Sequence, residues 1–306
     1  MSKPTLHVEE AGPLTTVQDL GRPGLASLGV PESGALDPRA LELANRLVGN
    51  PEDAPGLEVT FGGLRLTARR PVVLAVTGAP VSVTVDGAAA GLGCAVPVPA
   101  GSRIKLGAPR YGVRSYLALR GGVRSDLVLG SASTDLLAGI GAPLSDGDDL
   151  DVGAAPETEV PVVDGVPLST PTGEDLVLRV VLGPRDDWFT DEALDLLLGS
   201  EWTVESRSNR IGVRLTGPTL QQRQQRELPS EGTIAGSIQV PHSGQPTLFL
   251  ADHPITGGYP VIAVVHTSDL PQLAQARPSQ LVRFRQVSPP RLAGRPERDD
   301  QAQAMR

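Results

Sequence analysis

The segment TTVQDLGRPG, residues 15–24, gathers polar side chains that could bind a small ligand. In an extended chain Thr16 and Gln18 share one side, while Asp19 and Arg22 are expected to face each other across the Pro-Gly turn. A carboxylate could orient a nucleophile or a metal, and a guanidinium could hold a carboxylate or a phosphate. An ion pair that braces a tight loop explains the same residues, because loop carboxylates commonly accept hydrogen bonds from nearby amides. Both interpretations remain open from this segment alone.

Two further clusters of small residues have the composition of anion-binding loops. Ser33 and Gly34 precede a predicted helix, where free amide groups and the helix dipole favour an anion. An ordinary helix start capped by Asp37 explains this stretch equally well. Ser131 and Ser133 lie in GSASTD, residues 130–135, which could cradle a phosphate or simply form a turn.

The segment SNRIGVRL, residues 208–215, carries two arginines after Asn209. Strand alternation predicts Arg210 and Arg214 on one face, with about 7 Å between them along the strand. Two aligned guanidiniums could clamp a carboxylate or a phosphate. They could equally pair with acidic side chains such as Glu231, and the sequence favours neither alternative.

Polar residues also interrupt the apolar strands predicted between residues 237 and 265. Gln239 and Asp252 lie within apolar runs, where buried polar groups need hydrogen-bond partners. Gly257 and Gly258 precede Tyr259 and allow close backbone approach or unusual dihedral angles. A hairpin turn explains the two glycines but not the two polar side chains.

The overall composition excludes several classes of protein. A net charge of -8 argues against nucleic acid or an anionic membrane as a partner. Cys94 is the only cysteine, so no intramolecular disulfide or zinc cluster can form, and the four histidines lack metal-ligand spacing. We therefore predict no metal site. The sequence contains no P-loop, no apolar signal core and no apolar run long enough to cross a bilayer, which leads us to expect a cytoplasmic protein.

Glycine and proline, 35 and 29 residues, divide the chain into many short apolar runs and predict a mainly β protein with a few short helices. The clearest helix follows Asp37, with Pro38 at its first position and Gly49 at its end. Two more are predicted in TDEALDLLLGS, residues 190–200, and over residues 269–276. The predicted organisation is an N-terminal domain at 1–155, a linker at 156–175, a C-terminal domain at 176–288 and a flexible tail at 289–306.

Taken in order, nine motifs resemble the KipA/PxpC family, also called the allophanate hydrolase subunit 2 or biotin-dependent carboxyltransferase family. The motifs are TTVQDLGRPG, GVPESGALD, ANRLVGN, TGAP, YLALRGG, GSASTD, SNRIGVRL, IQVPHSGQP and TGGYPVIAVV, and the likeness extends from about residue 14 to residue 287. The resemblance implies two cyclophilin-like β-barrel domains. This agrees with the two strand-rich halves found independently.

The resemblance also implies a function within a complex. Members of this kind, with a KipI/PxpB-type subunit and a PxpA-type (LamB/YcsF) component, form an ATP-dependent 5-oxoprolinase that opens the lactam of 5-oxo-L-proline to L-glutamate. ATP with Mg is then expected in the assembled complex. Related sequences act as biotin-dependent carboxyltransferases in urea carboxylase, and another relative antagonises a KipI-like inhibitor of a histidine kinase. Neither lysine of this chain lies between methionines, so we expect no biotin attached to it.

The family motifs suggest which residues contact substrate or phosphate. Asp19, Arg22 and Arg210 are the candidate catalytic residues. The candidate binding residues are Thr16, Gln18, Ser33, Gly34, Ser131, Ser133, Asn209, Arg214, Gln239, Asp252, Gly257, Gly258 and Tyr259. The chain departs from the family pattern at Ala132 and His253, where arginine is usual, so each of these motifs lacks a cation.

Overall fold

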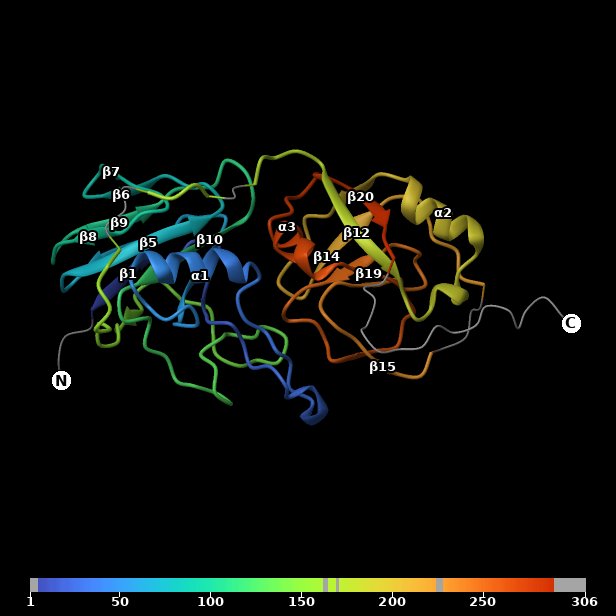
Figure 1. The fold of residues 1–306 in the computed structure, drawn as a ribbon, viewed down its shortest axis with the longest axis horizontal. Coiled ribbons are helices and arrows are strands. Elements are labelled where there is room, and N and C mark those ends of the chain that lie inside the picture. Colours follow the sequence, from blue (N-terminus) through green and yellow to red (C-terminus); the bar gives the residue numbers. More distant parts are fainter. Residues whose placement is uncertain (1–4, 162–164, 169–170, 224–227, 289–306) are drawn as a thin grey trace, which may run out of the picture.

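The computed structural model describes residues 5–161, 165–168, 171–223 and 228–288. The predicted tail at 289–306 lies outside the described residues, as do positions 162–164 and 169–170 of the predicted linker. Figure 1 shows two lobes side by side, one formed by each half of the chain. The first lobe carries blue and green elements, and the second carries yellow, orange and red ones.

The first lobe contains two antiparallel sheets whose inner faces pack on a shared aliphatic core. Leu6, Leu57, Leu66, Leu74 and Ile104 are almost completely buried in it. The six-stranded sheet has the order β11 (Asp149–Leu150), β1 (Leu6–Glu10), β4 (Arg65–Ala68), β9 (Arg103–Leu106), β6 (Val83–Val85) and β7 (Ala88–Ala90). The five-stranded sheet has the order β2 (Leu14–Gln18), β3 (Gly56–Thr60), β10 (Arg114–Leu119), β5 (Val72–Gly78) and β8 (Val96–Val98).

The second lobe is a closed barrel of seven strands around a second core that includes Trp202, Phe189 and Ile262. The strand order is β12 (Leu176–Leu182), β19 (Val261–Val265), β16 (Ser237–Gln239), β17 (Thr247–Phe249), β14 (Gly212–Thr216), β13 (Trp202–Val204) and β20 (Leu281–Gln286). Parallel pairing of β12 with β20 closes it, so none of these seven strands is left at a free edge. A short ribbon joins β15 (Glu231–Gly232) and β18 (Thr256–Gly257). The mainly β prediction is confirmed, although the strands of the first lobe form two sheets and not one closed barrel.

Three α-helices complete the described part of the chain, as the sequence predicts. Helix α1 (Pro38–Leu47) begins at the expected proline, and the side chain of Asp37 accepts a hydrogen bond from the Ala40 amide at 3.2 Å. Its buried face packs on β5 and β10. Helix α2 is Asp191–Gly199 and α3 is Leu270–Ala274. Three 3-10 turns, η1 (Ala26–Leu28), η2 (Asp186–Trp188) and η3 (Thr267–Asp269), lie between strands and helices.

The two lobes are joined by hydrogen bonds that satisfy buried backbone groups. Gln275, which follows α3, accepts from the Val113 and Arg114 amides at 2.9 and 2.8 Å and donates to the Arg114 carbonyl at 3.0 Å. The Arg114 guanidinium in turn donates to the Ala274 carbonyl. Because these groups are buried, separating the lobes would leave several donors and acceptors without partners.

Candidate functional site

A buried group of charged side chains lies where the two lobes meet; we call Ser33, Glu58, Arg114, Arg210 and Asp252 the charge network. Arg210, which precedes β14, is 0% exposed. Its Nε and Nη2 donate to the two oxygens of Asp252 at 2.9 and 2.8 Å. Its Nη1 donates to Glu58 at 2.6 Å. One guanidinium of the second lobe therefore holds a carboxylate from each lobe.

Glu58 is the member of the network that comes from the middle of a buried strand. Its second oxygen accepts from the Leu36 amide at 3.0 Å and from the Tyr116 hydroxyl at 2.8 Å, while Arg114 Nε lies 3.4 Å from the first. Burial alone would raise the pKa of Glu58, but the charges of Arg210 and Arg114 outweigh it and lower that pKa. Burial also lowers the pKa of Arg114 and raises the pKa of the Tyr116 phenol. The network is consequently built around an ionised Glu58.

The lowered pKa of Glu58 makes the stability of the fold depend on pH. A carboxyl group whose pKa is lower in the folded state stabilises the fold above its unfolded value of about 4.3, and loses that effect as pH falls through the folded value. We expect the free energy of unfolding to become smaller as the pH is lowered through this acidic range. In Glu58→Gln the free energy of unfolding should depend less on pH. Urea denaturation at a series of pH values measures it. If the free energy of unfolding depended on pH equally in the parent protein and in Glu58→Gln, the lowered pKa of Glu58 would not be the cause.

A second cluster surrounds Asp19, at the end of β2. One oxygen of Asp19 accepts from Ser131 and Ser133 hydroxyls at 2.6 and 2.5 Å and from the Gly21 amide at 2.8 Å. The other accepts from the Ala132 amide at 2.7 Å. The loop predicted as a phosphate cradle is therefore filled by a carboxylate of the protein itself. In this structure the hydroxyls of Ser131 and Ser133 both donate to Asp19.

Arg22 does not pair with Asp19 as the sequence predicts. Its Nη2 donates to the Ser133 carbonyl at 2.5 Å and its Nε to the Val128 carbonyl at 3.3 Å. The side chain is 2% exposed, and its Nη1 has no hydrogen-bond partner within the described residues. Arg22 thus keeps one buried donor free. The acceptors Gln18 Oε1 and Asp135 Oδ2 are also buried without a partner there.

Glycines bring the loops around Asp19 and Ser33 into direct backbone contact. Gly21 has φ +88°, and a Cβ there would lie 2.6 Å from the Glu32 carbonyl oxygen. Gly34 has φ +95°, and a Cβ there would lie 2.9 Å from the Gly21 nitrogen. Neither position accommodates a larger residue without strain. This contact fixes where Ser33 enters the charge network.

The Thr134 carbonyl connects the two clusters. It accepts from Gln18 Nε2 at 2.9 Å and from Ser33 Oγ at 3.1 Å. Gln18 also donates to Thr16 Oγ1 at 3.0 Å, and Ser33 Oγ lies 2.7 Å from Asp252. The Gly34 carbonyl accepts from Arg210 at 2.8 Å. The structure therefore brings most of the predicted residues near Asp19, Ser33 and Arg210 into one continuous buried assembly.

The predicted pair of aligned arginines is wrong. Arg210 lies before β14 and is fully buried, whereas Arg214 lies within the strand and is exposed. The Asn209 side chain closes the turn before β14 by accepting from the Ile211 amide at 2.9 Å. Glu231 pairs with Arg185 and not with either of these arginines. The arginines therefore cannot act as a two-pronged clamp.

Among the described residues, no hydrogen bond links the side chains of Gln239 and Tyr259 to the charge network, and Gln239 is the last residue of β16. Gln239 donates to the Tyr259 carbonyl at 3.0 Å, and a Cβ on Gly257 would lie 2.4 Å from its amide nitrogen. Gly257 thus serves close approach, while neither it nor Gly258 has positive φ, so unusual dihedral angles are not needed. The Tyr259 side chain is 42% exposed and meets His242 edge-on, with 5.6 Å between ring centroids.

Sequence reasoning missed Glu58, Arg114 and Tyr116, although a signal exists. Glu58 interrupts GLEVT, a strand that is buried at all five positions. A charged residue inside such a run needs a buried counter-ion. The sequence does not reveal that this partner is an arginine 152 positions later.

We expect Asp19→Asn to destabilise the protein by about 1–3 kcal/mol, because an amide places N–H groups where the carboxylate accepts from hydroxyls and from a backbone amide. Asp126→Asn, in an exposed loop, serves as the control and should leave stability within about 0.5 kcal/mol of the parent. Chemical denaturation of both variants measures the difference. Equal stabilities would show that the hydrogen bonds to Asp19 contribute nothing net.

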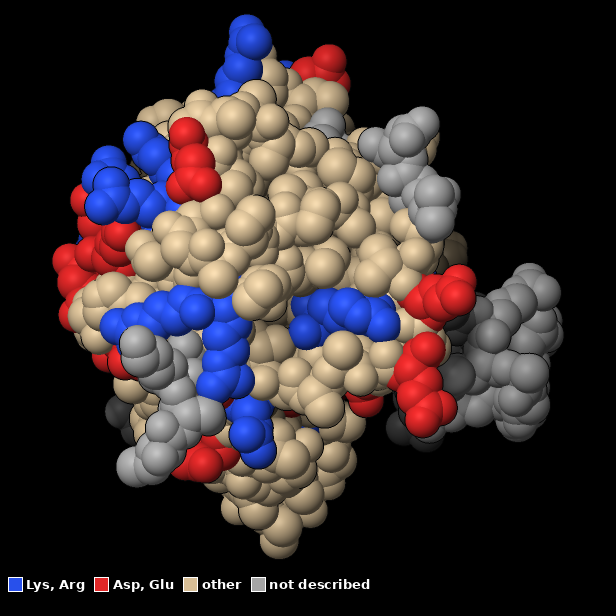
Figure 2. Space-filling view, turned by 90° about the vertical axis from the view of Figure 1, so that its left-hand side faces the viewer, with Lys and Arg blue, Asp and Glu red and all other residues tan. Residues whose placement is uncertain are grey.

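The described residues contain no group of three His, Cys, Asp or Glu side chains that could hold a metal ion. No helix among them is both long and apolar enough to span a membrane. The end of the first lobe seen in Figure 2 is mostly uncharged, with basic and acidic side chains both present around it.

Comparison with known families identifies this architecture. Residues 28–286 match the model of the carboxyltransferase domain, subdomain A and B. The chain belongs to this carboxyltransferase-domain family. The resemblance drawn from the nine sequence motifs is thereby confirmed. The chain is 40% identical over 287 residues to the C-type subunit of the 5-oxoprolinase of Escherichia coli K12, covering 92% of this chain and 91% of that protein.

Solved structures of longer proteins contain the same carboxyltransferase-domain fold. TTHA0988 matches with a TM-score of 0.84 and 38% identity, over 93% of this chain and 56% of that one. The urea amidolyase of K. lactis matches with a TM-score of 0.86 and 30% identity, over 94% of this chain and 19% of that one. The chain spans only about half, or less, of these two solved relatives.

Proposed function

We propose that this chain is the C-type subunit of an ATP-dependent 5-oxoprolinase that opens the lactam of 5-oxo-L-proline to L-glutamate. The supporting observation is the 40% identity to the Escherichia coli protein of that name, which extends over nine-tenths of both chains. A relative from Haemophilus influenzae with the same name is 36% identical. The proposed partners are a KipI/PxpB-type subunit and a PxpA-type component, and ATP with Mg is bound in the assembled complex.

The chemistry requires activation, because an amide carbonyl is a poor electrophile. Of the candidate catalytic residues, Arg22 best suits a direct role, since its Nη1 is a free donor that could stabilise charge developing on a substrate or phosphate oxygen. Asp19 acts as a positioning residue, because it holds the loop whose Ser133 carbonyl fixes Arg22. Arg210 is also a positioning residue in this proposal, since its guanidinium donates only to groups of the protein itself.

The partner subunit is proposed to dock on the exposed leucines beside this site. We call Leu28, Leu127, Leu129, Leu136 and Leu137 the apolar loop surface; their exposed fractions are 73, 66, 56, 37 and 46%. The inner sides of these loops carry the Asp19 cluster and, through the Leu136 amide, contact Asp252 at 3.2 Å. These leucines are exposed on loops that adjoin the Asp19 cluster, and exposed apolar surface commonly marks a protein interface. The longer chains that include this fold are consistent with a neighbouring domain or subunit.

The direct test measures glutamate release from 5-oxoproline and ATP with all three purified components, and in parallel without this chain. We expect turnover only in the complete mixture. Turnover that is indifferent to this chain overturns the proposal. A stable complex with the KipI/PxpB-type subunit but without turnover favours instead a regulatory role, in which this chain sequesters its partner.

A biotin-dependent carboxyltransferase function is the second candidate. The family model and the 30% identity to the Saccharomyces cerevisiae urea amidolyase, which covers 91% of this chain, favour it. Biotin would then be carried by another chain. Transfer of a carboxyl group from carboxybiotin to urea by this chain and its partner, with no release of glutamate from 5-oxoproline, would favour this alternative.

A further inference from the structure

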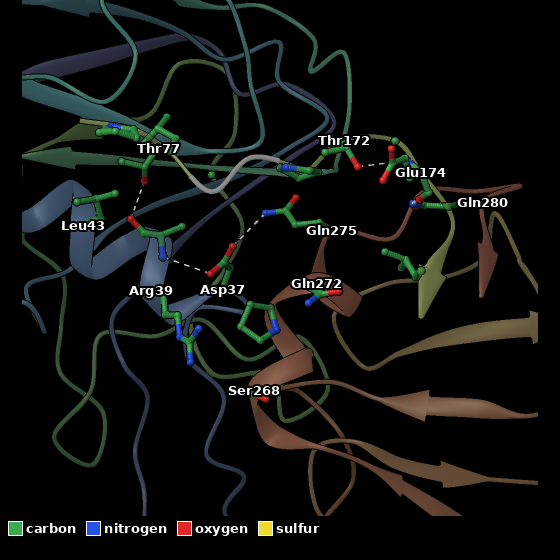
Figure 3. A pocket seen from close by; sticks show the side chains of 18 of the residues that line it. Asp37, Arg39, Leu43, Thr77, Thr172, Glu174, Ser268, Gln272, Gln275 and Gln280 are labelled. Atoms are coloured by element: carbon green, nitrogen blue, oxygen red, sulfur yellow. Dashed lines mark hydrogen bonds between the residues drawn. The ribbon is translucent and has the colours of Figure 1, made fainter. Parts of the chain in front are cut away.

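A cavity of about 550 Å³ lies between the lobes, away from the Asp19 cluster. Its walls are α1, the end of β5, α3 and residues 171–176, which lead into β12. Figure 3 shows polar side chains from both lobes around it. Its volume falls within the range of about 300–1,000 Å³ that is typical of pockets for small ligands. The site proposed above does not use this cavity.

Two unpaired charges of opposite sign lie at opposite ends of the cavity. Figure 3 shows Arg39 at one end and Glu174 at the other. Both are exposed, and within the described residues neither side chain forms an ion pair or a hydrogen bond, although Arg39 acts electrostatically on Asp37. Arg46, by contrast, is bound to Glu52 at 2.7 Å, and Asp175 lies 3.8 Å from Arg283.

Amide side chains lie between the two charged ends. Gln275 is held by its hydrogen bonds to β10, and its Nε2 lies 3.4 Å from Asp37. Gln272, on α3, lines the cavity, and its side chain makes no hydrogen bond to the other described residues. Its amide therefore offers both a donor and an acceptor to a ligand.

We propose that this cavity binds a short peptide with free termini. Its carboxylate would pair with Arg39, its ammonium group with Glu174, and a peptide group between them with the Gln272 amide. A ligand with a single charge would leave one of the two ends without a partner, whereas a peptide presents both charges with amide groups between them. The inference goes beyond the proposed function, because it concerns a separate cavity and a different class of ligand.

The test is a titration of the purified chain with trialanine, followed by NMR, alongside N-acetyl-trialanine and trialanine amide. We expect saturable binding of trialanine and weaker binding of both blocked forms. Arg39→Gln should weaken trialanine binding about 2- to 5-fold while leaving the affinity for trialanine amide unchanged. Glu174→Gln should likewise weaken trialanine binding about 2- to 5-fold while leaving the affinity for N-acetyl-trialanine unchanged. Each variant thus removes the response to one terminus only.

Arg124→Gln is the matched control, because Arg124 is also exposed, has no side-chain hydrogen bond or ion pair within the described residues and does not line the cavity. It should bind all three peptides like the parent protein. Absence of saturable trialanine binding, equal binding of the blocked forms, or an equal effect of the control would overturn the proposal. Since the assay uses this chain alone, such a failure would not bear on 5-oxoproline turnover.

Discussion

Replacing Arg210 with Met is expected to lower the free energy of unfolding by about 3–5 kcal/mol. The substitution leaves the carboxylates of Glu58 and Asp252 buried without the guanidinium that pairs with both. Removing one partner of a buried ion pair has this large effect because the remaining charge is out of water and uncompensated. Arg210→Lys should recover only part of the loss, since an ammonium group cannot reproduce the two-pronged contact with Asp252.

Urea denaturation of Arg210→Met and Arg214→Met provides the measurement. The two arginines are four positions apart, but only Arg210 is buried, so Arg214→Met should change stability by less than about 0.5 kcal/mol. A similar small loss in both variants would mean that the charge network contributes no more than a surface arginine. If Arg210→Met yields no folded protein, Arg210→Lys still gives a measurable difference from the control.

Helix α1 shows what the sequence could predict. Its start depends on Asp37 and Pro38, which act on neighbouring backbone groups, and its buried stripe repeats over a few residues. Such signals are local and need no knowledge of the remaining chain. The closed barrel is different, because it depends on parallel pairing between β12 and β20, which are about a hundred residues apart. No local pattern predicts which strands close it.

The same distinction applies to the site. Asp252 could be identified as a buried polar residue that needs a partner, and the structure supplies Arg210. The sequence could not show that Ser131 and Ser133 would be taken by Asp19, because the three residues meet only when β2 packs against a loop more than a hundred positions away. Hydroxyl-rich loops that bind a ligand and those that bind an internal carboxylate have the same composition.

Replacing Leu137 with Asp is expected to weaken binding of the proposed KipI/PxpB-type partner by about 2 kcal/mol or more, roughly 30-fold in Kd. Leu137 is 46% exposed, so the substitution should leave the fold stable while placing a charge in the apolar loop surface. Burial of that charge against an apolar partner is unfavourable. Leu28→Asp tests the loop that contains η1. Leu28 is 73% exposed, the most of the five leucines, so this substitution should disturb the fold least.

Leu196→Asp is the matched control, because Leu196 is 37% exposed but lies on α2, in the second lobe. Calorimetric titration with the partner subunit gives the affinities, and the three-component assay gives turnover. We expect Leu137→Asp and Leu28→Asp to lose affinity and turnover together, and turnover to return when the partner is raised above the new Kd. Equal affinities in all three variants would place the interface elsewhere. Lost turnover with unchanged affinity would instead assign these loops to the reaction, through the Arg22 and Asp19 residues that they cover.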